Sequence, residues 1–471
     1  MRIYLLGIAG TGMGSFAGLL RKAGHEVTGS EGEGVYPPMS DKLAEWQIPY
    51  FIGYRKENFA NAFGGRGIEL AVVGNVIRAE NPEARAVRRM GIPHLSFPEA
   101  LGELFLADKH GVVIVGTHGK TTTTSLMASV LMTAGREPSL LVGGVPLDFN
   151  EGFRSGSGPH FVIEGDEYDT AYFDKGPKFL HYRPRTAIFT GAEFDHADIY
   201  RDLPHYESAF ERFVAILPDD GFLATCTTFA NWRRITESVK CKMETYSASA
   251  PAQWTQRGLT LGPAGAQFEV LFQGRPDARV TLPSAGRHNV ENALGVWAAC
   301  RALGLSGDET ARGFAGFKGV KRRQELRGVA RGVAVIDDFA HHPTAVRETI
   351  AAVAAQYPGR RLIAVFEPRS NTAMRKIHQD EYAHAFAGAA LAIISQPTAL
   401  AKVPEAERVD AKKMAADIAA AGTPCRWMGS PDAIVEALAA EAREGDVILV
   451  MSNGAFGGLH GKLLAALEAR T

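Results

Sequence analysis

Short apolar runs rich in β-branched residues recur along the chain, and each ends in glycines or polar residues before a helical pattern begins. This alternation predicts parallel α/β architecture, in which strands and helices follow one another. The runs form three blocks: residues 2–7, 26–30 and 70–75; residues 112–115, 161–164 and 186–190; and residues 333–337, 362–366, 391–395 and 447–451.

Polar stretches separate the three blocks and set the predicted domain boundaries. They lie at residues 107–111 and 318–323, so the predicted domains are residues 1–107, 108–318 and 319–471. A chain of 471 residues is longer than one hydrophobic core usually supports, which agrees with more than one domain. Between residues 227 and 281 the pattern is shorter and more broken, and this predicts a small β-rich excursion inside the middle domain.

Composition and charge narrow the class of protein. Hydrophobic residues make up 46% of the chain and its formal net charge is −1, so no basic excess indicates nucleic acid or an anionic membrane as a partner. Glycines interrupt the first apolar run before it reaches the roughly 7–15 residues of a signal-peptide core. The cysteines, Cys226, Cys241, Cys300 and Cys425, show no paired spacing, which is typical of thiols in a reducing compartment. We therefore expect a cytoplasmic protein.

A phosphate-binding loop is predicted directly after residues 112–115. Glycines let backbone N–H groups surround a phosphate, and the N-terminus of the following helix adds partial positive charge. Lys120 can neutralise the β- and γ-phosphates, and the Thr121 hydroxyl is placed to bind magnesium. The general pattern GxxxxGK[ST] is incomplete, because its first glycine would fall on Ile114. The loop consists of Gly116, Thr117, His118, Gly119, Lys120, Thr121 and Thr122.

Acidic residues and a histidine follow the next two predicted strands. Glu164 begins the acidic segment EGDEYD, and carboxylate oxygens are suitable magnesium ligands. Only one or two of these acidic residues need to bind metal, so most of them are expected to form a solvated loop. His196 follows residues 186–190. A lone histidine is more often structural, but its place after another strand of the same sheet favours a site.

A second glycine-rich loop follows residues 2–7. It contains Gly7, Gly10, Gly12 and Gly14, and Ser15 replaces the third glycine of GxGxxG counted from Gly10. This pattern alone fits a dinucleotide-binding oxidoreductase about as well as a UDP-sugar site. The phosphate loop downstream favours the UDP-sugar site, because hydride transfer does not require it. Glu31, at the end of the second strand, could reach a ribose or sugar hydroxyl.

Taken in order, these motifs resemble the Mur ligase family over nearly the whole chain. They are GIAGTGMG, GTHGKTTT, EGDEYD, EFDH, GRHNVENA at residues 286–293 and DDFAHHPT at residues 337–344. The resemblance implies three α/β domains. These are a Rossmann-like UDP-binding domain, a central P-loop ATP-binding domain with a parallel sheet, and a C-terminal Rossmann-like domain that brings the amine substrate.

The resemblance also implies roles for individual residues. Thr121, Glu164 and His196 would bind magnesium. Lys120, His196, Asp338 and His341 would be catalytic, although a structural hydrogen bond that braces the turn is an equal alternative for the His341–His342 pair. ATP would contact the phosphate loop together with His288, Asn289, Asn292 and Arg327. The UDP-sugar would contact Gly7, Gly10, Thr11, Gly12, Met13, Gly14, Ser30 and Glu31.

One position departs from the family pattern. Many members carry a lysine after the DH motif that is modified to a carbamate and helps to bind a second metal ion. By a count without gaps, this position is Phe210. The sequence therefore leaves the ligands of a second magnesium ion unassigned.

Three further motifs indicate a branch of the family. Residues 36–40 (YPPMS), 367–372 (EPRSNT) and 452–454 (SNG) resemble members that join a murein tripeptide, L-alanyl-γ-D-glutamyl-meso-diaminopimelate, to UDP-N-acetylmuramate. The resemblance implies an ATP- and magnesium-dependent ligase that acts through an acyl phosphate in peptidoglycan recycling. Arg369, with Ser370 and Asn371, would bind a peptide carboxylate, because guanidinium can bind it bidentately. An ordinary surface arginine is the alternative.

Other functions remain open at this point. The nearest is the ligase that adds a single L-alanine to the same sugar nucleotide. From another class, an NAD-dependent sugar-nucleotide oxidoreductase is possible, whereas a regulatory nucleotide-binding module is disfavoured because Lys120, Glu164 and His196 are all in place. The expected partners are small-molecule substrates. Oligomeric state and the choice between diaminopimelate and lysine in the peptide are not indicated.

Overall fold

The computed structural model describes residues 1–37 and 39–469. Pro38 of the YPPMS motif lies outside the described residues, as do Arg470 and Thr471 at the end of the predicted third domain. The chain divides into two compact units. Unit 1 comprises Met1–Glu193, Leu203–Trp254 and Ala293–Gly316, and unit 2 comprises Phe194–Asp202, Thr255–Asn292 and Phe317–Thr471.

Unit 1 begins with a five-stranded parallel sheet in the order β3-β2-β1-β4-β5. Its strands are β1 (Arg2–Leu6), β2 (Glu26–Glu31), β3 (Tyr50–Ile52), β4 (Leu70–Val73) and β5 (His94–Ser96). One face packs against α3 (Glu57–Asn61) and α4 (Pro82–Arg89), and α1 (Thr11–Lys22) follows β1. Strands buried on both faces require nearly continuous apolar sequence. The runs predicted at residues 2–7, 26–30 and 70–75 are thus confirmed as β1, β2 and β4.

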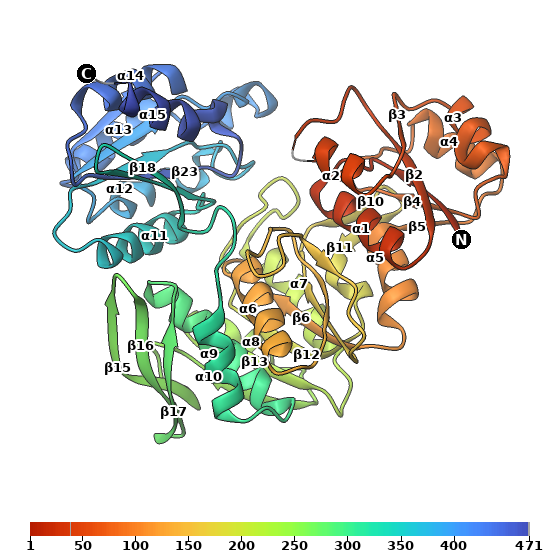
Figure 1. The fold of residues 1–471 in the computed structure, drawn as a ribbon, viewed down its shortest axis with the longest axis horizontal. Helices are drawn as coiled ribbons and strands as arrows, with labels where there is room; N and C mark the ends of the chain where they lie inside the picture. The colour runs from red at the N-terminus through yellow and green to blue at the C-terminus, as the bar shows by residue number, and fades with distance from the viewer. Residues whose placement is uncertain (38, 470–471) are drawn as a thin grey trace. The chain divides into compact units, whose positions relative to one another are not determined.

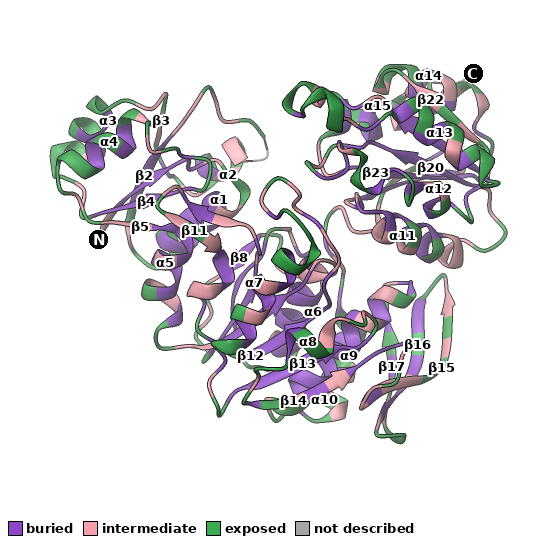
Figure 2. Ribbon diagram, turned by 180° about the vertical axis from the view of Figure 1, so that it is seen from behind, coloured by how far each residue is buried: buried purple, intermediate pink, exposed green. Residues whose placement is uncertain are grey.

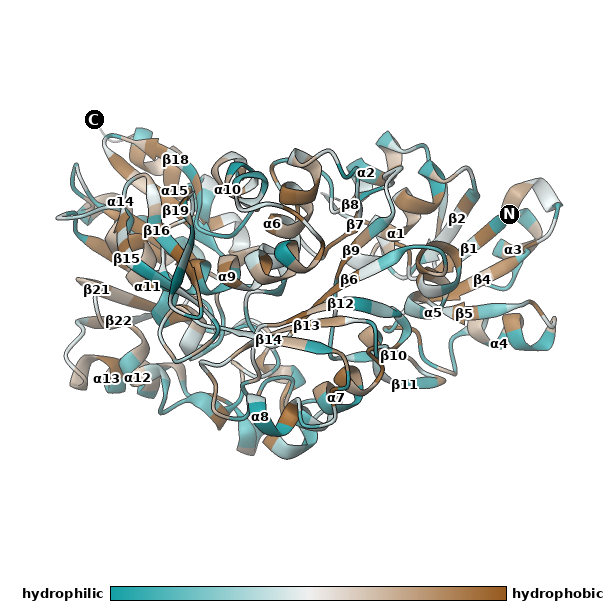
Figure 3. Ribbon diagram, turned by 90° about the horizontal axis from the view of Figure 1, so that it is seen from below, coloured by the Kyte–Doolittle hydropathy of each residue, from teal (hydrophilic) through white to brown (hydrophobic). Residues whose placement is uncertain are grey.

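The central sheet of unit 1 has the order β14-β13-β12-β6-β9-β7-β8. Its strands are β6 (His110–Val115), β7 (Ser139–Leu141), β8 (Phe153–Arg154), β9 (His160–Glu164), β12 (Pro184–Phe189), β13 (Phe222–Cys226) and β14 (Lys242–Tyr246). Hydrophobic residues run along these central strands (Figure 3). Since β12, β6 and β9 are parallel neighbours, their carboxyl ends meet at one edge of the sheet.

Helix α6 (Lys120–Thr133) follows the phosphate loop and is buried along most of its length. It packs closely against α10 (Gly307–Gly316) at Gly313, where a Cβ atom would lie 2.7 Å from the Cα of Val130. A helix buried on all sides shows no strong amphipathic pattern. The sequence of α6 therefore has no distinct polar face, although the segment forms a helix.

The predicted β-rich excursion is confirmed as a run of strands. β15 (Trp254–Gly262), β16 (Gly265–Phe272) and β17 (Arg275–Leu282) follow β14, and β16 pairs with β17 in antiparallel fashion. Most of this segment groups with unit 2, whereas the sequence placed it in the middle domain. The two domain boundaries inferred from the sequence stay predictions.

The C-terminal part of unit 2 is a six-stranded sheet in the order β18-β19-β23-β20-β21-β22. Its strands are β18 (Glu325–Ala330), β19 (Val333–Asp338), β20 (Leu362–Phe366), β21 (Leu391–Ser395), β22 (Cys425–Met428) and β23 (Val447–Met451). Only β18 runs antiparallel to its neighbour among the described strands of this sheet. All four apolar runs predicted for the third block are confirmed as β19, β20, β21 and β23.

Helices cover both faces of this C-terminal sheet. One face packs against α11 (Pro343–Gln356), α12 (Tyr382–Ala385) and α13 (Ala411–Ala420). The other face packs against α14 (Pro431–Glu441) and α15 (Leu459–Glu468). In Figure 1, α11 and α12 lie on the opposite side of the strands from α14 and α15. The central strands between them are buried (Figure 2). This doubly covered sheet confirms the predicted α/β fold class.

Two expectations about the whole chain can be compared with the structure. Among the residues that the structure describes, we find no helix with the length and apolar character needed to cross a membrane. Cys226, Cys241 and Cys300 are buried, whereas Cys425 is half-buried. The cysteines are therefore mostly core residues.

A histidine pair makes the stability of unit 1 depend on pH. His110 pairs with His160 across β6 and β9, with ring centroids 5.5 Å apart, and its Nε2 lies 2.8 Å from the Thr186 hydroxyl. Burial, and after it the neighbouring His160 and Arg185, lowers the pKa of His110 to about 4. The unfolded chain binds this proton near pH 6.5, so the stabilisation is complete above that pH and is lost as the pH falls from about 6.5 to about 4.

We therefore expect the urea midpoint of unfolding to fall between pH 7 and pH 5, and to fall less in a His110→Gln variant. His384→Gln, at an exposed position of α12, is the control and should keep the pH dependence of the unmodified protein. An identical pH dependence in His110→Gln and the unmodified protein would contradict the assignment.

Candidate active site

The phosphate loop lies at the carboxyl end of β6 and is held against the end of β12. The N–H of Thr117 donates to the Gly191 carbonyl (2.9 Å), and the Thr190 hydroxyl donates to the His118 carbonyl (2.6 Å). Gly119 precedes α6 with a φ of +78°, a left-handed conformation that glycine adopts readily. The loop therefore leads directly into the N-terminus of a helix, which is a favourable place for phosphate.

Lys120 has acceptors for its ammonium group within this loop and one charged partner. Its Nζ donates to the carbonyls of Gly116 (2.6 Å) and Thr117 (3.3 Å), and it forms an ion pair with Glu167 at 2.9 Å. Burial alone would lower the pKa of Lys120, but Glu167, followed by Asp166 and Glu164, raises it above its usual value. Lys120 is therefore a largely buried lysine, with its side chain 11% exposed, that stays charged.

Glu167 corrects one prediction. The sequence predicted that most of the acidic segment EGDEYD forms a solvated loop. The Glu167 side chain is only 1% exposed, however, and Glu164, Asp166 and Asp169 are half-buried. Asp166 pairs with Lys178 at 3.1 Å. The acidic residues were expected to face water, but two of them serve instead as counter-ions for half-buried or buried lysines.

A tyrosine that the sequence did not indicate completes the network around Lys120. The Tyr206 hydroxyl, on α7 (Leu203–Ala215), donates to Glu167 (3.0 Å) and lies 2.9 Å from the Thr117 hydroxyl. Thr117 in turn donates to the Glu193 carbonyl at 2.9 Å. Neither Glu167 nor Tyr206 follows from a spacing rule, because their roles arise from contacts between distant segments.

Thr121 and Glu164 lie together in the arrangement expected for a magnesium site. The Thr121 hydroxyl donates to Glu164 Oε1 (2.9 Å), and the Gly143 N–H donates to Oε2 (2.9 Å). Burial, and then the charge of Asp166, raises the pKa of Glu164, while Lys120 opposes the shift. A divalent cation would offset this accumulation of buried negative charge, and hydroxyl and carboxylate oxygens are its preferred ligands. These residues therefore fit magnesium.

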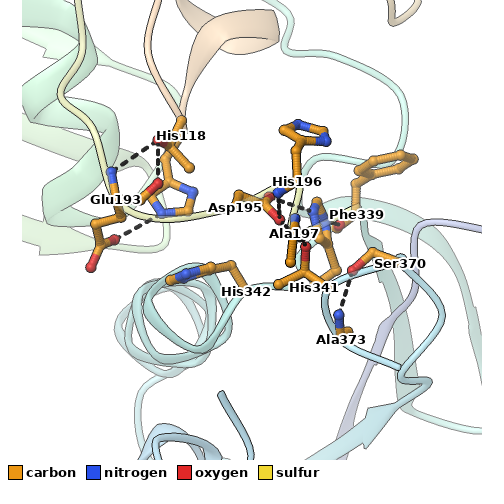
Figure 4. A network of polar contacts seen from close by, with 12 residues as sticks. His118, Glu193, Asp195, His196, Ala197, Phe339, His341, His342, Ser370 and Ala373 are labelled. Carbon is orange, nitrogen blue, oxygen red and sulfur yellow. Dashed lines mark hydrogen bonds and ion pairs between the residues drawn. The ribbon is translucent and has the colours of Figure 1, made fainter. Parts of the chain in front are cut away.

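Two other residues predicted for this region, His118 and His196, belong to different units of the structure. His118 Nε2 lies 2.8 Å from the Glu193 carboxylate (Figure 4). His196, the third predicted magnesium ligand, belongs to unit 2 and not to unit 1. Its role, and that of Thr122 and the other loop residues in binding ATP, stays a prediction.

Phe210 occupies an apolar cluster in unit 1. Its ring is fully buried, with centroid distances of 5.8 Å to Phe179, 5.4 Å to Phe189 and 5.2 Å to Tyr206. A phenyl ring offers no metal ligand, and its aromatic neighbours exclude a charged group. Residue 210 therefore contributes nothing to a second metal site.

The glycine loop after β1 combines exposed and buried positions. Gly10 and Thr11 are exposed at the start of α1, whereas Met13 and Gly14 are buried and Gly12 is half-buried. Gly7 has a φ of +80° and so adopts the left-handed conformation. Gly10 and Thr11 are thus the residues of this loop most accessible to a ligand.

Ser30 and Glu31 brace the first sheet from within. Glu31 accepts hydrogen bonds from the N–H groups of Ala9 (3.0 Å) and Gly32 (2.9 Å) and from the Tyr54 hydroxyl (2.9 Å). Ser30 donates to Glu83, which is fully buried. Glu31 therefore ties the glycine loop to the ends of β2 and β3, and its predicted contact with a sugar hydroxyl stays untested.

The residues predicted to approach the nucleotide from unit 2 form two groups. Asn289 and Asn292 are buried at the start of α9 (Arg287–Ala302), where Asn289 donates to the Ala285 carbonyl at 2.7 Å. His288 Nε2 lies 3.2 Å from the Gln324 side-chain nitrogen. Arg327 is exposed and forms ion pairs with Glu325 at 3.5 Å and with Asp337 at 3.8 Å. These contacts place His288 beside the segment that begins the C-terminal sheet.

Asp338 and the histidine pair follow β19. Asp338 accepts from the N–H groups of Gln324 (2.8 Å) and Ala340 (2.7 Å), and burial raises its pKa. His342 caps α11, because its Nδ1 accepts from the Thr344 N–H at 3.3 Å. His341 instead points to Asp195, with 3.7 Å between Nε2 and Oδ2 (Figure 4). His341 Nδ1 also lies 3.0 Å from the Phe339 carbonyl, so both histidines make a hydrogen bond that braces the turn. A catalytic role for His341 stays a prediction.

The EPRSNT segment after β20 forms a loop that we call the peptide loop (residues 367–372). Arg369 is 42% exposed, pairs with buried Glu367 at 3.6 Å and lies against Gly454, where a Cβ atom would collide with its side chain. Ser370 accepts from the Ala373 N–H (3.0 Å), and Asn371 donates to Asp198 (2.8 Å). The EPRSNT and SNG motifs are therefore adjacent, and the guanidinium remains accessible.

Three family models match the chain in succession. They are described as the Mur ligase family catalytic domain (residues 2–109), the Mur ligase middle domain (residues 114–300) and the Mur ligase glutamate ligase domain (residues 322–454). Together they cover most of the chain.

Individual proteins are similar over the full length. The UDP-N-acetylmuramate–L-alanyl-γ-D-glutamyl-meso-2,6-diaminoheptandioate ligase of Escherichia coli (strain K12) is 39% identical, covering 100% of this chain and 99% of that protein. The Haemophilus influenzae protein of the same name is 35% identical, covering 99% of each. The crystal structure of a murein peptide ligase from Psychrobacter arcticus superposes with a TM-score of 0.73 at 34% identity, covering 100% of this chain and 99% of that one.

These similarities exclude the oxidoreductase interpretation and agree with the phosphate loop, the buried lysine and the doubly covered C-terminal sheet. The chain belongs to the Mur ligase family, whose members are ATP-dependent ligases that form amide bonds.

Proposed function

We propose that this protein joins L-alanyl-γ-D-glutamyl-meso-diaminopimelate to UDP-N-acetylmuramate, with ATP as the energy source and magnesium as the cofactor. The observation that carries the proposal is the meeting of Lys120, Thr121 and Glu164 beyond β6 and β9. The similarity to the Escherichia coli ligase over both full lengths supports the choice of substrates. We further propose that these reactions take place in the cytoplasm during peptidoglycan recycling.

The reaction requires an activated carboxylate, because amide formation from a free carboxylate is unfavourable in water. The lactyl carboxylate of UDP-N-acetylmuramate attacks the γ-phosphorus of ATP, which gives an acyl phosphate and ADP. The alanyl amine of the peptide then attacks the acyl carbon, a C–N bond forms, phosphate leaves and the amine loses a proton. Two anions approach each other in the first step, so neutralisation of charge is the main task of the protein.

Lys120 performs this task at the phosphate loop. Glu167 keeps the ammonium group charged inside a buried site, and Tyr206 ties Glu167 to the loop through Thr117. Thr121 and Glu164 would hold magnesium, with His196 as the third proposed ligand. When bound, the ion neutralises phosphate charge and orients the oxygens for transfer.

The remaining proposed sites follow the three predicted domains. The UDP-sugar binds at the glycine loop of residues 1–107, where Gly10 and Thr11 are exposed. ATP binds within residues 108–318, with His288, Asn289 and Asn292 near the adenine. Arg327, Asp338 and His341 contribute from residues 319–471. The peptide binds at Arg369, Ser370 and Asn371.

The first prediction distinguishes the tripeptide from a single amino acid. With UDP-N-acetylmuramate, ATP and magnesium present, we expect phosphate release when the tripeptide is added and little release with free L-alanine. Reactions without the sugar nucleotide provide the background. Faster release with alanine than with the tripeptide would assign the sister activity instead.

The second prediction concerns the loop lysine. Lys120→Ala removes a positive charge from the site of phosphoryl transfer, so we expect phosphate release with the tripeptide to fall by about 10²–10³. Lys242→Ala is the control, because this lysine is exposed and pairs only with Glu244 among the ion pairs described for it. Normal turnover in Lys120→Ala would rule out the proposed role.

The third prediction concerns recognition of the peptide. Arg369→Ala removes an accessible guanidinium, and a lost charge-assisted hydrogen bond corresponds to about a 10- to 100-fold rise in KM for the tripeptide. The KM for ATP should stay unchanged. Arg426→Ala, at a half-exposed arginine paired with Glu441, provides the matched control. An unchanged tripeptide KM in Arg369→Ala would favour the surface-arginine interpretation.

A further inference from the structure

The segment that carries His196 is attached to the C-terminal part of unit 2. In sequence, residues 194–202 follow the central strand β12, and the family model for the middle domain covers them. In the structure, Phe194–Asp202 groups with Phe317–Thr471. Residues 194–202 were expected to belong with the ATP-binding sheet. Their contacts instead group them with the unit that contains the peptide loop.

Asp195 and Thr372 form the centre of this attachment. The Thr372 hydroxyl donates to Asp195 Oδ1 at 2.6 Å, and both residues are buried. The same carboxylate oxygen accepts the backbone N–H of His196 at 2.7 Å, and the Ala197 N–H donates to the Thr372 hydroxyl at 3.4 Å. One hydroxyl of the peptide loop is therefore linked to the residues on both sides of His196.

Contacts on either side extend the attachment. His378 Nε2 lies 3.1 Å from the Phe194 carbonyl, His341 faces the second oxygen of Asp195, and Asn371 donates to Asp198 at 2.8 Å. The contacts thus run from Phe194 to Asp198, along the first part of the segment. Such a set of contacts orients the backbone as well as anchoring it.

The backbone of His196 itself requires this support. Its φ is +52°, a left-handed conformation that non-glycine residues rarely adopt. The His196 carbonyl accepts from the N–H groups of Ile199 (2.8 Å) and Tyr200 (2.9 Å), which forms a tight turn. Unusual backbone conformations persist only where the surroundings fix them. Asp195 and Thr372 provide that surrounding structure.

We propose that Asp195 and Thr372 are positioning residues that fix His196 to the peptide loop, so that the third magnesium ligand is placed by the same part of the enzyme that binds the peptide. This inference rests on the proposed function for the roles of His196 and the peptide loop. The attachment of residues 194–202 to the peptide loop rests on the hydrogen bonds alone. Thr372 acts here through Asp195.

Hydrogen exchange tests the attachment without any catalytic assay. In Thr372→Val the buried carboxylate loses its hydroxyl donor, and we expect amides in residues 194–202 to exchange about tenfold faster or more. Thr372→Ser keeps the hydroxyl and should exchange as the unmodified protein does. Thr423→Val is the matched control, because Thr423 is buried in the same unit and donates to the Phe386 carbonyl at 3.3 Å. It should leave residues 194–202 unchanged.

Magnesium dependence tests the positioning role. In the full-length enzyme, we expect Thr372→Val to raise the half-saturating magnesium concentration by about tenfold, with Thr372→Ser and Thr423→Val close to the unmodified protein. If Thr372→Val does not fold, Asp195→Asn provides the second variant with the same expected results. Unchanged exchange would overturn the attachment, and faster exchange with unchanged magnesium dependence would overturn the positioning role. If the unmodified protein does not use the tripeptide, the proposed function fails, while the exchange result still decides the attachment.

Discussion

A lysine that is buried and yet charged is the constraint on which unit 1 depends. An ammonium group removed from water is unfavourable unless nearby acceptors and an opposite charge compensate it. The structure supplies two carbonyls of the phosphate loop and the buried carboxylate of Glu167. Each partner comes from the end of a parallel strand or the loop that follows it. The pairing of β6 with β9 therefore brings together the groups that compensate the buried charge.

The same network has a consequence for the nucleotide. The loop does not present a bare cation to solvent, because Glu167 already balances Lys120. A triphosphate must then interact with a lysine that has another anion beside it, and magnesium at Thr121 and Glu164 would compensate the added negative charge. Lys120 and the nearby carboxylates thus form one electrostatic system, which a magnesium ion would join, and a change in any of these groups alters the others.

The fold could be predicted from the sequence where burial on both faces leaves a continuous apolar run. The strands β6, β9 and β20 are of this kind, and the phosphate loop follows from glycine spacing beside one of them. Glu167, in the segment after β9, and Tyr206, on α7, could not be identified in this way, because their roles arise from contacts with segments far away in sequence. The connection of Asp195 to Thr372 joins residues separated by 177 positions. No local pattern encodes such a contact.

Phe210 shows how an apolar residue can remove a chemical dependence. A carbamate forms only when an uncharged amine reacts with dissolved carbon dioxide, so enzymes that use one depend on the supply of that gas. Here the position predicted to correspond is a phenyl ring that contacts Phe179, Phe189 and Tyr206. It has neither the amine nor the polar surroundings for that modification, so no carbamate can form at residue 210, and a second metal ion would need ligands from other residues.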